Sequence, residues 1–344
     1  MISILLPTLL LSLIGIFNLF GTAPTLVASQ TLFLIIGLGV FFIFKKIGRN
    51  FFASNTFLWY VLFIGILILT FIIGLEVKGS KRWINLLFFN FQASEFFKPF
   101  FILFFAHYLV QNSVYVHPAR RFLTALLFFI IPALIIFKQP DLGNAMVYGY
   151  MFIMLVLFSG VHKMYLLRFL LLISMAVPLL WNFLKPYQKD RILTFFNPDV
   201  DTQGSSYHII QSIITIGSGQ FLGKGLGMGT QSNLSFLPEN HTDFAFSSLV
   251  EQLGFLGGSA TIILFIILIF ALVGKCFALV SLPDEQDKKK FLYTVGFLSY
   301  LIFSIFINIG MNVGIFPITG ISLPFISYGG SSLVATMIGL AILP

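Results

Sequence analysis

The sequence predicts an all-α polytopic membrane protein with ten transmembrane helices and a large extracytoplasmic loop between the seventh and the eighth. Hydrophobic residues make up 58% of the 344 positions, charged residues make up only 9%, and the mean hydropathy is +0.99. Soluble domains are nearer ~45–50% apolar and ~25% charged. So few charges cannot cover the surface of a water-soluble globule. The composition therefore excludes a cytosolic enzyme, a nucleic-acid-binding protein and a disordered chain.

The ten spans follow from long apolar stretches, because a bilayer core of ~30 Å needs about 20 apolar residues per helix. Eight such stretches lack Asp, Glu, Lys and Arg: 1–44, 51–75, 99–119, 122–137, 142–162, 169–184, 252–274 and 291–344. The first is divided at 21–30 and the last at 308–324, so each of these supplies two spans. Two stretches, 122–137 and 169–184, are short, and we expect their helices to extend into flanking charged residues that snorkel.

The basic residues of the short loops predict the orientation. One set of loops holds eleven of them: Lys45, Lys46, Arg49, Arg120, Arg121, Lys163, Arg168, Lys275, Lys288, Lys289 and Lys290. The opposite set holds five: Lys78, Lys81, Arg82, Lys98 and Lys138. Since cytoplasmic loops are enriched in Lys and Arg, the first set and both termini are predicted to be cytoplasmic. The one cysteine, Cys276, then lies on the reducing side and excludes a disulfide within the chain.

The loop 185–245 is predicted to be a structured and functional element on the outer side. It holds nine of the 32 charged residues: Lys185, Lys189, Asp190, Arg191, Asp199, Asp201, Lys224, Glu239 and Asp243. Isoleucines at helical spacing between 209 and 216 predict a short helix that buries this stripe against the membrane surface. Six glycines follow within 217–229, and this segment is either a flexible connector or a backbone cradle for a bulky anionic ligand.

Asp243 is the candidate general base. It lies in Pro238–Phe244, where the polar loop re-enters an apolar helix, so its carboxylate is expected to be partly desolvated and therefore more basic. An N-cap role for Thr242 or Asp243 is an equally weighted alternative. His241 of the same segment is the one histidine singled out as a candidate substrate contact.

Other charged groups beside the spans admit a structural and a functional interpretation. Glu95 and Lys98 lie three residues apart and are predicted to pair, with substrate binding as the alternative. Asp141 is predicted first to cap the following helix and second to bind substrate. Arg82 and Trp83 are either an aromatic-belt anchor or an anion contact.

The segment 316–332 is predicted to be a broken helix, because it combines two prolines and three glycines within an apolar stretch. Irregular backbone at membrane depth is tolerated only where protein or a watery cavity surrounds it. We therefore expect this segment, with its candidate substrate contacts Ser327 and Tyr328, to line an outward-facing cavity together with the large loop.

These motifs together resemble the SEDS family of membrane proteins (shape, elongation, division and sporulation), which includes RodA and FtsW. The matching stretches are 78–84, Ser94–Lys98, Gln139–Gly143, Leu237–Phe244 and Pro317–Ser332. The loop stretches 207–212, 217–219 and 229–232 are more similar to RodA than to FtsW. The resemblance implies a single SEDS-type membrane domain over 1–344. One departure is Ala245, which stands where a bulkier aliphatic residue is usual.

The resemblance implies a peptidoglycan glycosyltransferase, a hexosyltransferase that polymerises lipid II during cell-wall elongation and cell-shape maintenance. It implies a bacterial inner (plasma) membrane protein that contacts lipid II, the nascent glycan-lipid, membrane lipids and a class B penicillin-binding transpeptidase, and no nucleic acid. Carried over by position, the family's essential aspartate falls on Asp243, its acid–base pair on Glu95 and Lys98, its Arg-Trp on Arg82 and Trp83, and its Pro-Asp-Leu-Gly aspartate on Asp141.

The mechanism expected from these residues is attack of one sugar hydroxyl on the anomeric carbon of a second polyprenyl-pyrophosphate-linked sugar, with Asp243 as base. The leaving pyrophosphate needs cations, and Lys98, Arg82, Lys224 and Lys138 are available. No metal site is predicted, and a divalent cation, Mg²⁺ or Mn²⁺, is left open as a cofactor. The alternatives are a lipid II flippase or transporter, and a scaffold for a class B penicillin-binding protein.

Overall fold

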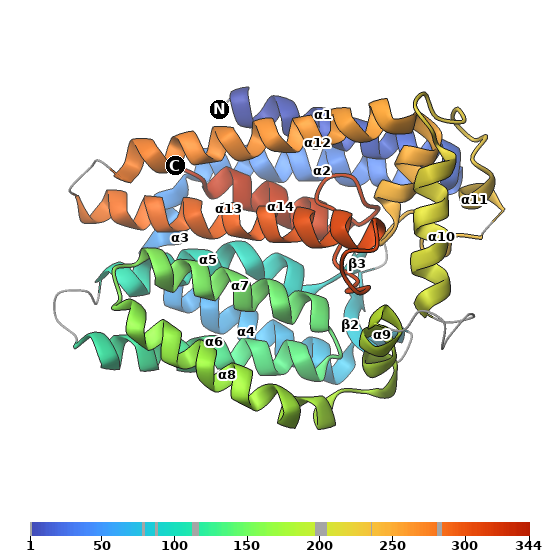
Figure 1. The fold of residues 1–344 in the computed structure, drawn as a ribbon. Helices are drawn as coiled ribbons and strands as arrows, with labels where there is room; N and C mark the ends of the chain where they lie inside the picture. Colours follow the sequence, from blue (N-terminus) through green and yellow to red (C-terminus); the bar gives the residue numbers. More distant parts are fainter. Residues whose placement is uncertain are drawn as a thin grey trace. The chain divides into compact units, whose positions relative to one another are not determined.

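The computed structural model describes residues 2–77, 80–86, 89–111, 117–196, 205–234, 236–280 and 284–344 (Figure 1). Within these ranges the chain forms helices and three short strands. The helices are α1 (Ile2–Thr22), α2 (Pro24–Ile47), α3 (Arg49–Ser54), α4 (Thr56–Ile73), α5 (Ala93–Gln111), α6 (Pro118–Lys138), α7 (Leu142–Phe158), α8 (Lys163–Phe183), α9 (Pro186–Phe196), α10 (Ser205–Ser218), α11 (Thr230–Asn233), α12 (Ala245–Val280), α13 (Glu285–Asn312) and α14 (Gly330–Ile342). Contacts divide the chain into two compact units. Unit 1 comprises 1–34, 181–271 and 304–329, and unit 2 comprises 35–180, 272–303 and 330–344.

Seven of the described helices are long and apolar enough to cross a membrane, namely α1, α2, α4, α5, α6, α12 and α13. Two shorter apolar helices are α7, with 17 residues, and α14, with 13. The chain is therefore an all-α polytopic membrane protein with seven candidate spans. As expected, α6 and α8 extend beyond their apolar stretches, beginning at Pro118 and Lys163.

Three boundaries differ from the sequence-based expectation. The first long stretch is interrupted only at Ala23, because Pro24 is well tolerated in the first turn of α2. Helix α5 begins at Ala93 rather than 99, since Glu95 and Lys98 neutralise each other inside the helix. The irregular segment near the C-terminus spans 313–329, later than the predicted break at 308–324.

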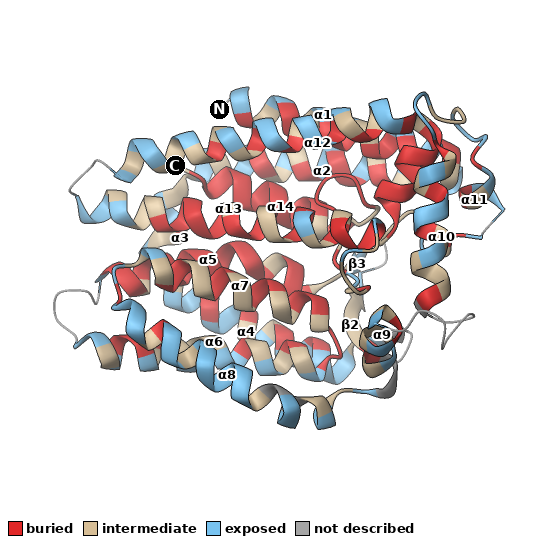
Figure 2. Ribbon diagram, viewed as in Figure 1, coloured by how far each residue is buried: buried red, intermediate tan, exposed pale blue. Residues whose placement is uncertain are grey.

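Helix α5 is the centre of unit 2. It packs against α4, α6, α7 and α14, and Figure 2 shows it buried over most of its length, whereas α8 is largely exposed. Its phenylalanines Phe97, Phe101 and Phe105 are fully buried. A helix that is apolar on every face is expected at such a position. The ionisable residues at its beginning are thereby held in the interior of the unit.

A short antiparallel sheet in the order β1-β2-β3 adds an element that the all-α prediction lacked. Its strands are β1 (Leu75–Val77), β2 (Ser80–Asn85) and β3 (Asn90–Phe91). Leu75 pairs with Trp83, and Ile84 pairs with Phe91. The sheet positions Arg82 and Trp83 on β2, whereas residues 78 and 79 of the matching motif lie outside the described residues.

Helix α12 is broken at Gly254 (φ 69°, ψ −169°), in the part that belongs to unit 1, and the glycine-rich segment bridges the break. The carbonyl groups of Glu251 and Gln252 accept from the N–H groups of Lys224 and Gly225 at 2.9 and 3.0 Å. On the other side of the break, the N–H of Phe255 donates to the carbonyl of Gln220 at 2.9 Å. The exposed backbone groups of the kink are thus satisfied within the protein, as a membrane setting requires.

Helix α10 confirms the short helix predicted from the isoleucines, and burial of its apolar stripe against the membrane surface stays a prediction. Ile210, Ile213 and Ile214 are 42–47% exposed, whereas Ser212 and Thr215 are fully buried. The Ser212 hydroxyl makes hydrogen bonds to Ser247 Oγ at 2.6 Å and to the Asn312 carbonyl at 2.8 Å. Helix α10 therefore packs through its polar face and crosses the direction of α1 and α12 (Figure 1). Ile210, Ile213 and Ile214 are presented outward, whereas Ile209 packs against a buried cluster of unit 1.

Candidate functional site

The turn that carries Asp243 lies immediately before α12 in unit 1. Next to it, Leu237, Phe244, Met311 and Ile318 form a buried apolar cluster. His241, Thr242 and Asp243 are half-buried. For Asp243 this agrees with the partial desolvation that the sequence predicted for a carboxylate at a loop–helix junction. Asn240 anchors the turn, because its Nδ2 donates to the Ser232 carbonyl at 2.7 Å.

The irregular segment 313–329 holds the backbone of this turn, while the outward-facing cavity expected between the two segments stays a prediction. Tyr328 donates its N–H to the carbonyl of His241 at 2.8 Å, and Ser327 Oγ donates to the carbonyl of Thr242 at 2.6 Å. The carbonyl of Asp243 accepts from the Nδ2 groups of Asn308 and Asn312, each at 3.1 Å. Three successive carbonyl groups are thus fixed, which limits the positions open to the Asp243 carboxylate.

Arg191 of α9 is a candidate site residue that the sequence did not single out. A Cβ atom added to Gly320 would lie 3.8 Å from Asp243 Oδ2 and 3.9 Å from Arg191 Nη1, so both charged groups border the small space that this glycine leaves open. Arg191 Nη1 donates to the Ile318 carbonyl at 3.4 Å, and Gly320 has a positive φ of 72°. Sequence patterns contain no signal for this cluster, because positions 191, 243 and 320 meet only in the fold.

The candidate contacts around Asp243 fall into two kinds. The rings of His241 and Tyr328 lie 6.0 Å apart and are half-buried, so both reach the surface of the site. Ser327 is 6% exposed, and its Oγ also accepts from the Leu323 N–H at 2.9 Å. Its hydroxyl is therefore already committed to holding the turn, and a contact of Ser327 with substrate stays a prediction.

Lys224 lies in a second cluster of unit 1, around the fully buried Glu251. The Glu251 carboxylate accepts from Ser232 Oγ at 2.5 Å, from the N–H groups of Gln231 and Ser232 at 2.9 and 3.0 Å, and from Lys224 Nζ at 3.4 Å. Lys224 also donates to Thr230 Oγ1 at 2.8 Å. These bonds give Lys224 a structural role in closing the loop, while its role as a ligand for substrate stays a prediction.

The glycine-rich segment 217–229 is therefore neither a flexible connector nor an open cradle for an anion. The N–H groups of residues 223, 224, 225, 227 and 228 all donate within the chain, mainly to Glu251 and Gln252. A Cβ on Gly223 would approach the Gln252 carbonyl to 2.2 Å. The glycines are needed because the segment lies directly against the kink of α12.

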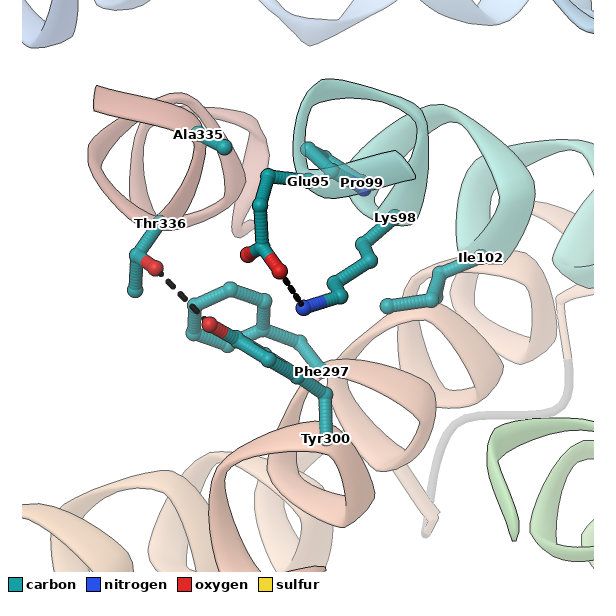
Figure 3. A pocket seen from close by; sticks show the side chains of 8 residues that line it. All are labelled: Glu95, Lys98, Pro99, Ile102, Phe297, Tyr300, Ala335 and Thr336. Atoms are coloured by element: carbon teal, nitrogen blue, oxygen red, sulfur yellow. Dashed lines mark hydrogen bonds and ion pairs between the residues drawn. The ribbon is translucent and has the colours of Figure 1, made fainter. Parts of the chain in front are cut away.

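Unit 2 contains the buried ion pair of Glu95 and Lys98, which confirms the predicted pairing. Lys98 Nζ lies 2.7 Å from Glu95 Oε1, and the two side chains are 5% and 7% exposed (Figure 3). Lys98 Nζ also lies 4.8 Å from the centre of the Tyr300 ring, close enough for a cation–π contact. The second carboxylate oxygen, Oε2, is buried and makes no hydrogen bond within the described chain. The space beside the pair is too small to hold a water molecule.

Arg82 and Asp141 meet at the sheet end of unit 2. Asp141 caps α7, as predicted, by accepting from the Asn144 N–H at 3.3 Å. It also accepts from Gln92 Nε2 at 3.2 Å and lies 3.6 Å from Arg82 Nη1. Arg82 donates further to the carbonyls of Gln139 and Pro140. Trp83 is half-buried on β2. The substrate-binding roles of these residues stay predictions.

No three His, Cys, Asp or Glu side chains among the described residues gather in a way that could hold a metal ion. The described acids of unit 1 are Asp190 on α9, Glu239 and Asp243 at the turn before α12, and Glu251 in its own cluster. The use of a divalent cation stays an open expectation.

Residues 3–344 match the FtsW/RodA/SpoVE family, described as cell cycle proteins. The chain is 33% identical over 343 residues to the peptidoglycan glycosyltransferase MrdB of Escherichia coli K12, covering 99% of this chain and 91% of that protein. It is 34% identical over 334 residues to a probable peptidoglycan glycosyltransferase FtsW of Nitrosococcus halophilus, covering 94% and 83%.

Two solved structures have the same fold. One is a chain from a study of polymerization and crosslinking by a peptidoglycan synthase complex, with a TM-score of 0.80, 29% identity, and coverage of 98% of this chain and 94% of that one. The other is the rod shape determining protein RodA of Thermus thermophilus, with a TM-score of 0.74, 25% identity, and coverage of 100% and 95%.

Proposed function

The chain belongs to the SEDS family of FtsW, RodA and SpoVE proteins, and on this premise we propose that it is a peptidoglycan glycosyltransferase that polymerises lipid II into glycan strands. The family match over nearly the whole chain and the similarity to two enzymes of that name support the proposal. We assign it the RodA role in cell-wall elongation because the loop stretches 207–212, 217–219 and 229–232 are more similar in sequence to RodA than to FtsW.

We further propose that ten helices cross a bacterial inner membrane with both termini in the cytoplasm. The seven candidate spans and the three further helices α7, α8 and α14 together make up the ten proposed spans. Lys45 Nζ donates to the Leu343 carbonyl at 3.1 Å, and Lys275 Nζ donates to the Pro344 carbonyl, so two of the basic loops meet the C-terminal end of the chain within unit 2. This grouping supports a common side for these loops, and the positive-inside rule makes that side cytoplasmic.

The observation that carries the proposed chemistry is the half-buried Asp243, whose carboxylate borders the open space at Gly320 together with the Arg191 guanidinium. In the proposed reaction a sugar hydroxyl attacks the anomeric carbon of a second lipid-linked sugar. A new C–O bond forms, the bond to the polyprenyl pyrophosphate breaks, and the hydroxyl proton passes to Asp243. A positioned base of this kind contributes about 10²–10⁴ in rate.

The leaving pyrophosphate gains negative charge as its bond breaks, so nearby cations stabilise the transition state. Arg191 borders the same small space at Gly320 as Asp243, and its fork of N–H groups suits phosphate oxygens. Its bond to the Ile318 carbonyl holds it in place before substrate binds. In unit 2 we assign phosphate binding to Lys98 and Arg82, with Glu95 and Asp141 orienting these cations through the contacts described above.

The alternatives are a lipid II flippase and a scaffold for a class B penicillin-binding transpeptidase. We propose such a transpeptidase as a partner, because a similar chain comes from a peptidoglycan synthase complex. A flippase needs charged sites at both membrane faces, yet nine of the twelve acids fall on the predicted outer side. This asymmetry favours chemistry at the outer face.

Purified protein incubated with lipid II, with products resolved on a gel, separates the three functions. We expect glycan chains. Leaflet exchange of a labelled lipid II in vesicles without chain formation would instead identify a flippase. A protein that neither polymerises nor exchanges lipid II, with or without its transpeptidase, would be a scaffold.

A further inference from the structure

We infer that unit 2 contains a binding site for an anionic phospholipid, formed by a basic cavity around Arg121 and an adjoining apolar groove along α7, α12 and α13. The site lies at the ends of helices next to the loops that the proposed topology places in the cytoplasm. The inference rests on this topology and not on the proposed transfer reaction.

Arg121 gives the cavity its charge. Arg121 lies in the first turn of α6 and is only 4% exposed. Its Nε is buried without a hydrogen-bond partner, and among the described residues its guanidinium forms no ion pair. A buried, unneutralised guanidinium is unfavourable unless an anion joins it. The cavity that it lines measures about 430 Å³, and the exposed Lys288 of α13 lies on the same cavity wall.

The groove supplies a place for an acyl chain. A second cavity, of about 260 Å³, shares the lining residues Phe158, Val280 and Phe291 with the first, so the two adjoin. Its lining is apolar apart from Ser299 and Cys276. Phe277 and Val280 are 72% and 59% exposed, so the groove opens at the surface of the molecule.

The combination of a cation and a groove fits a phospholipid better than a soluble anion. A free phosphate would satisfy Arg121 but leave the apolar groove empty, whereas an acyl chain would bury the groove's apolar surface. Basic pockets between transmembrane helices on the cytoplasmic side suit anionic head groups. We therefore assign the head group to Arg121 and Lys288, and one acyl chain to the groove beside Cys276.

The test is native mass spectrometry of the purified full chain, titrated with phosphatidylglycerol or with phosphatidylcholine carrying the same acyl chains. We expect phosphatidylglycerol to bind at least about tenfold more tightly, since the choline ammonium of phosphatidylcholine would be repelled by Arg121 and Lys288, which line the same cavity. R121Q should abolish this preference. R120Q removes an exposed arginine at the neighbouring position and should keep it.

Two further arms identify the ligand without relying on R121Q, which removes a buried side chain. V280W fills the groove at an exposed position and should weaken both lipids. Phosphatidylglycerol, but not glycerol 3-phosphate, should slow alkylation of Cys276 by N-ethylmaleimide. Equal binding of the two lipids, equal loss in R120Q and R121Q, or equal protection of Cys276 by glycerol 3-phosphate would overturn the inference. None of these measurements uses lipid II, so their failure would leave the proposed function untouched.

Discussion

At the residue scale, the ion pair of Glu95 and Lys98 offers a clean separation of stability from substrate binding. The pair is almost completely buried. In K98M the Glu95 carboxylate loses its partner, which should lower the free energy of unfolding by about 3–5 kcal/mol. The double variant with E95Q removes both charges and should recover most of this loss.

Thermal unfolding in detergent measures the effect of these variants, and the polymerisation assay gives their activity. If Lys98 binds pyrophosphate, the double variant will be folded and slow. A double variant that polymerises lipid II at the normal rate would restrict the pair to a structural role.

Arg191 is the second prediction at this scale. R191Q should lower the polymerisation rate by about 10–100-fold, because one charge-assisted hydrogen bond to a transition-state phosphate is lost. Lys189 on the same helix is the matched control, since its ammonium lies over the Trp181 ring at 6.0 Å. K189Q should stay near the wild-type rate. Equal losses in the two variants would point to general loop charge rather than to Arg191.

Local chemistry made part of the site predictable from the sequence. Glu95 and Lys98 pair through one turn of helix, and Asp141 caps the helix that directly follows it. Such contacts depend on spacing along the chain. The approach of Arg191 to Asp243 depends on the fold of three distant segments, and no spacing rule reveals it.

At the element scale, the broken helix α12 and the glycine-rich segment form one structural feature. Gly223 has a φ of +83°, and any Cβ there would meet the Gln252 carbonyl. G223A should therefore lower the free energy of unfolding by about 1–3 kcal/mol. A Cβ atom added to Gly217 in α10 would meet no atom within 4 Å, and G217A should be neutral or stabilising by about 0.4–1 kcal/mol.

Thermal unfolding of the two variants, compared with the wild type, checks this difference. A G223A protein as stable as G217A would show that the segment does not lie against the kink. The feature escaped sequence analysis because glycine content predicts only conformational freedom. The close approach that requires the glycines is set by Gln252, which is distant in the sequence, and by the break at Gly254.

At the scale of the whole molecule, composition and the positions of charges were enough to predict a polytopic all-α protein. The requirement for an uncharged apolar stretch was less reliable at the ends of the spans, because charged residues that pair with each other can lie inside a helix. Glu95 and Lys98 in α5 are the clearest case. The sheet that carries Arg82 also went unrecognised, since its strands have at most six residues and little alternation.

The topology makes a prediction for the whole chain. A fluorescent protein fused after Pro344 should fold and fluoresce, and alkaline phosphatase fused there should be inactive, because both reporters would stay in the cytoplasm. Alkaline phosphatase inserted after Glu239 in the large loop should be active. The reverse pattern would invert the assigned orientation and remove Asp243 from the face where lipid-linked sugars are joined.

The most direct test of the central claim is the rate of lipid II polymerisation by purified D243N. Asparagine keeps the size of the side chain and removes the base, so we expect a loss of about 10²–10⁴-fold with unchanged thermal unfolding. E239Q, at an exposed acid of the same loop, is the control and should polymerise normally. A D243N protein that makes glycan chains at the wild-type rate would contradict the account.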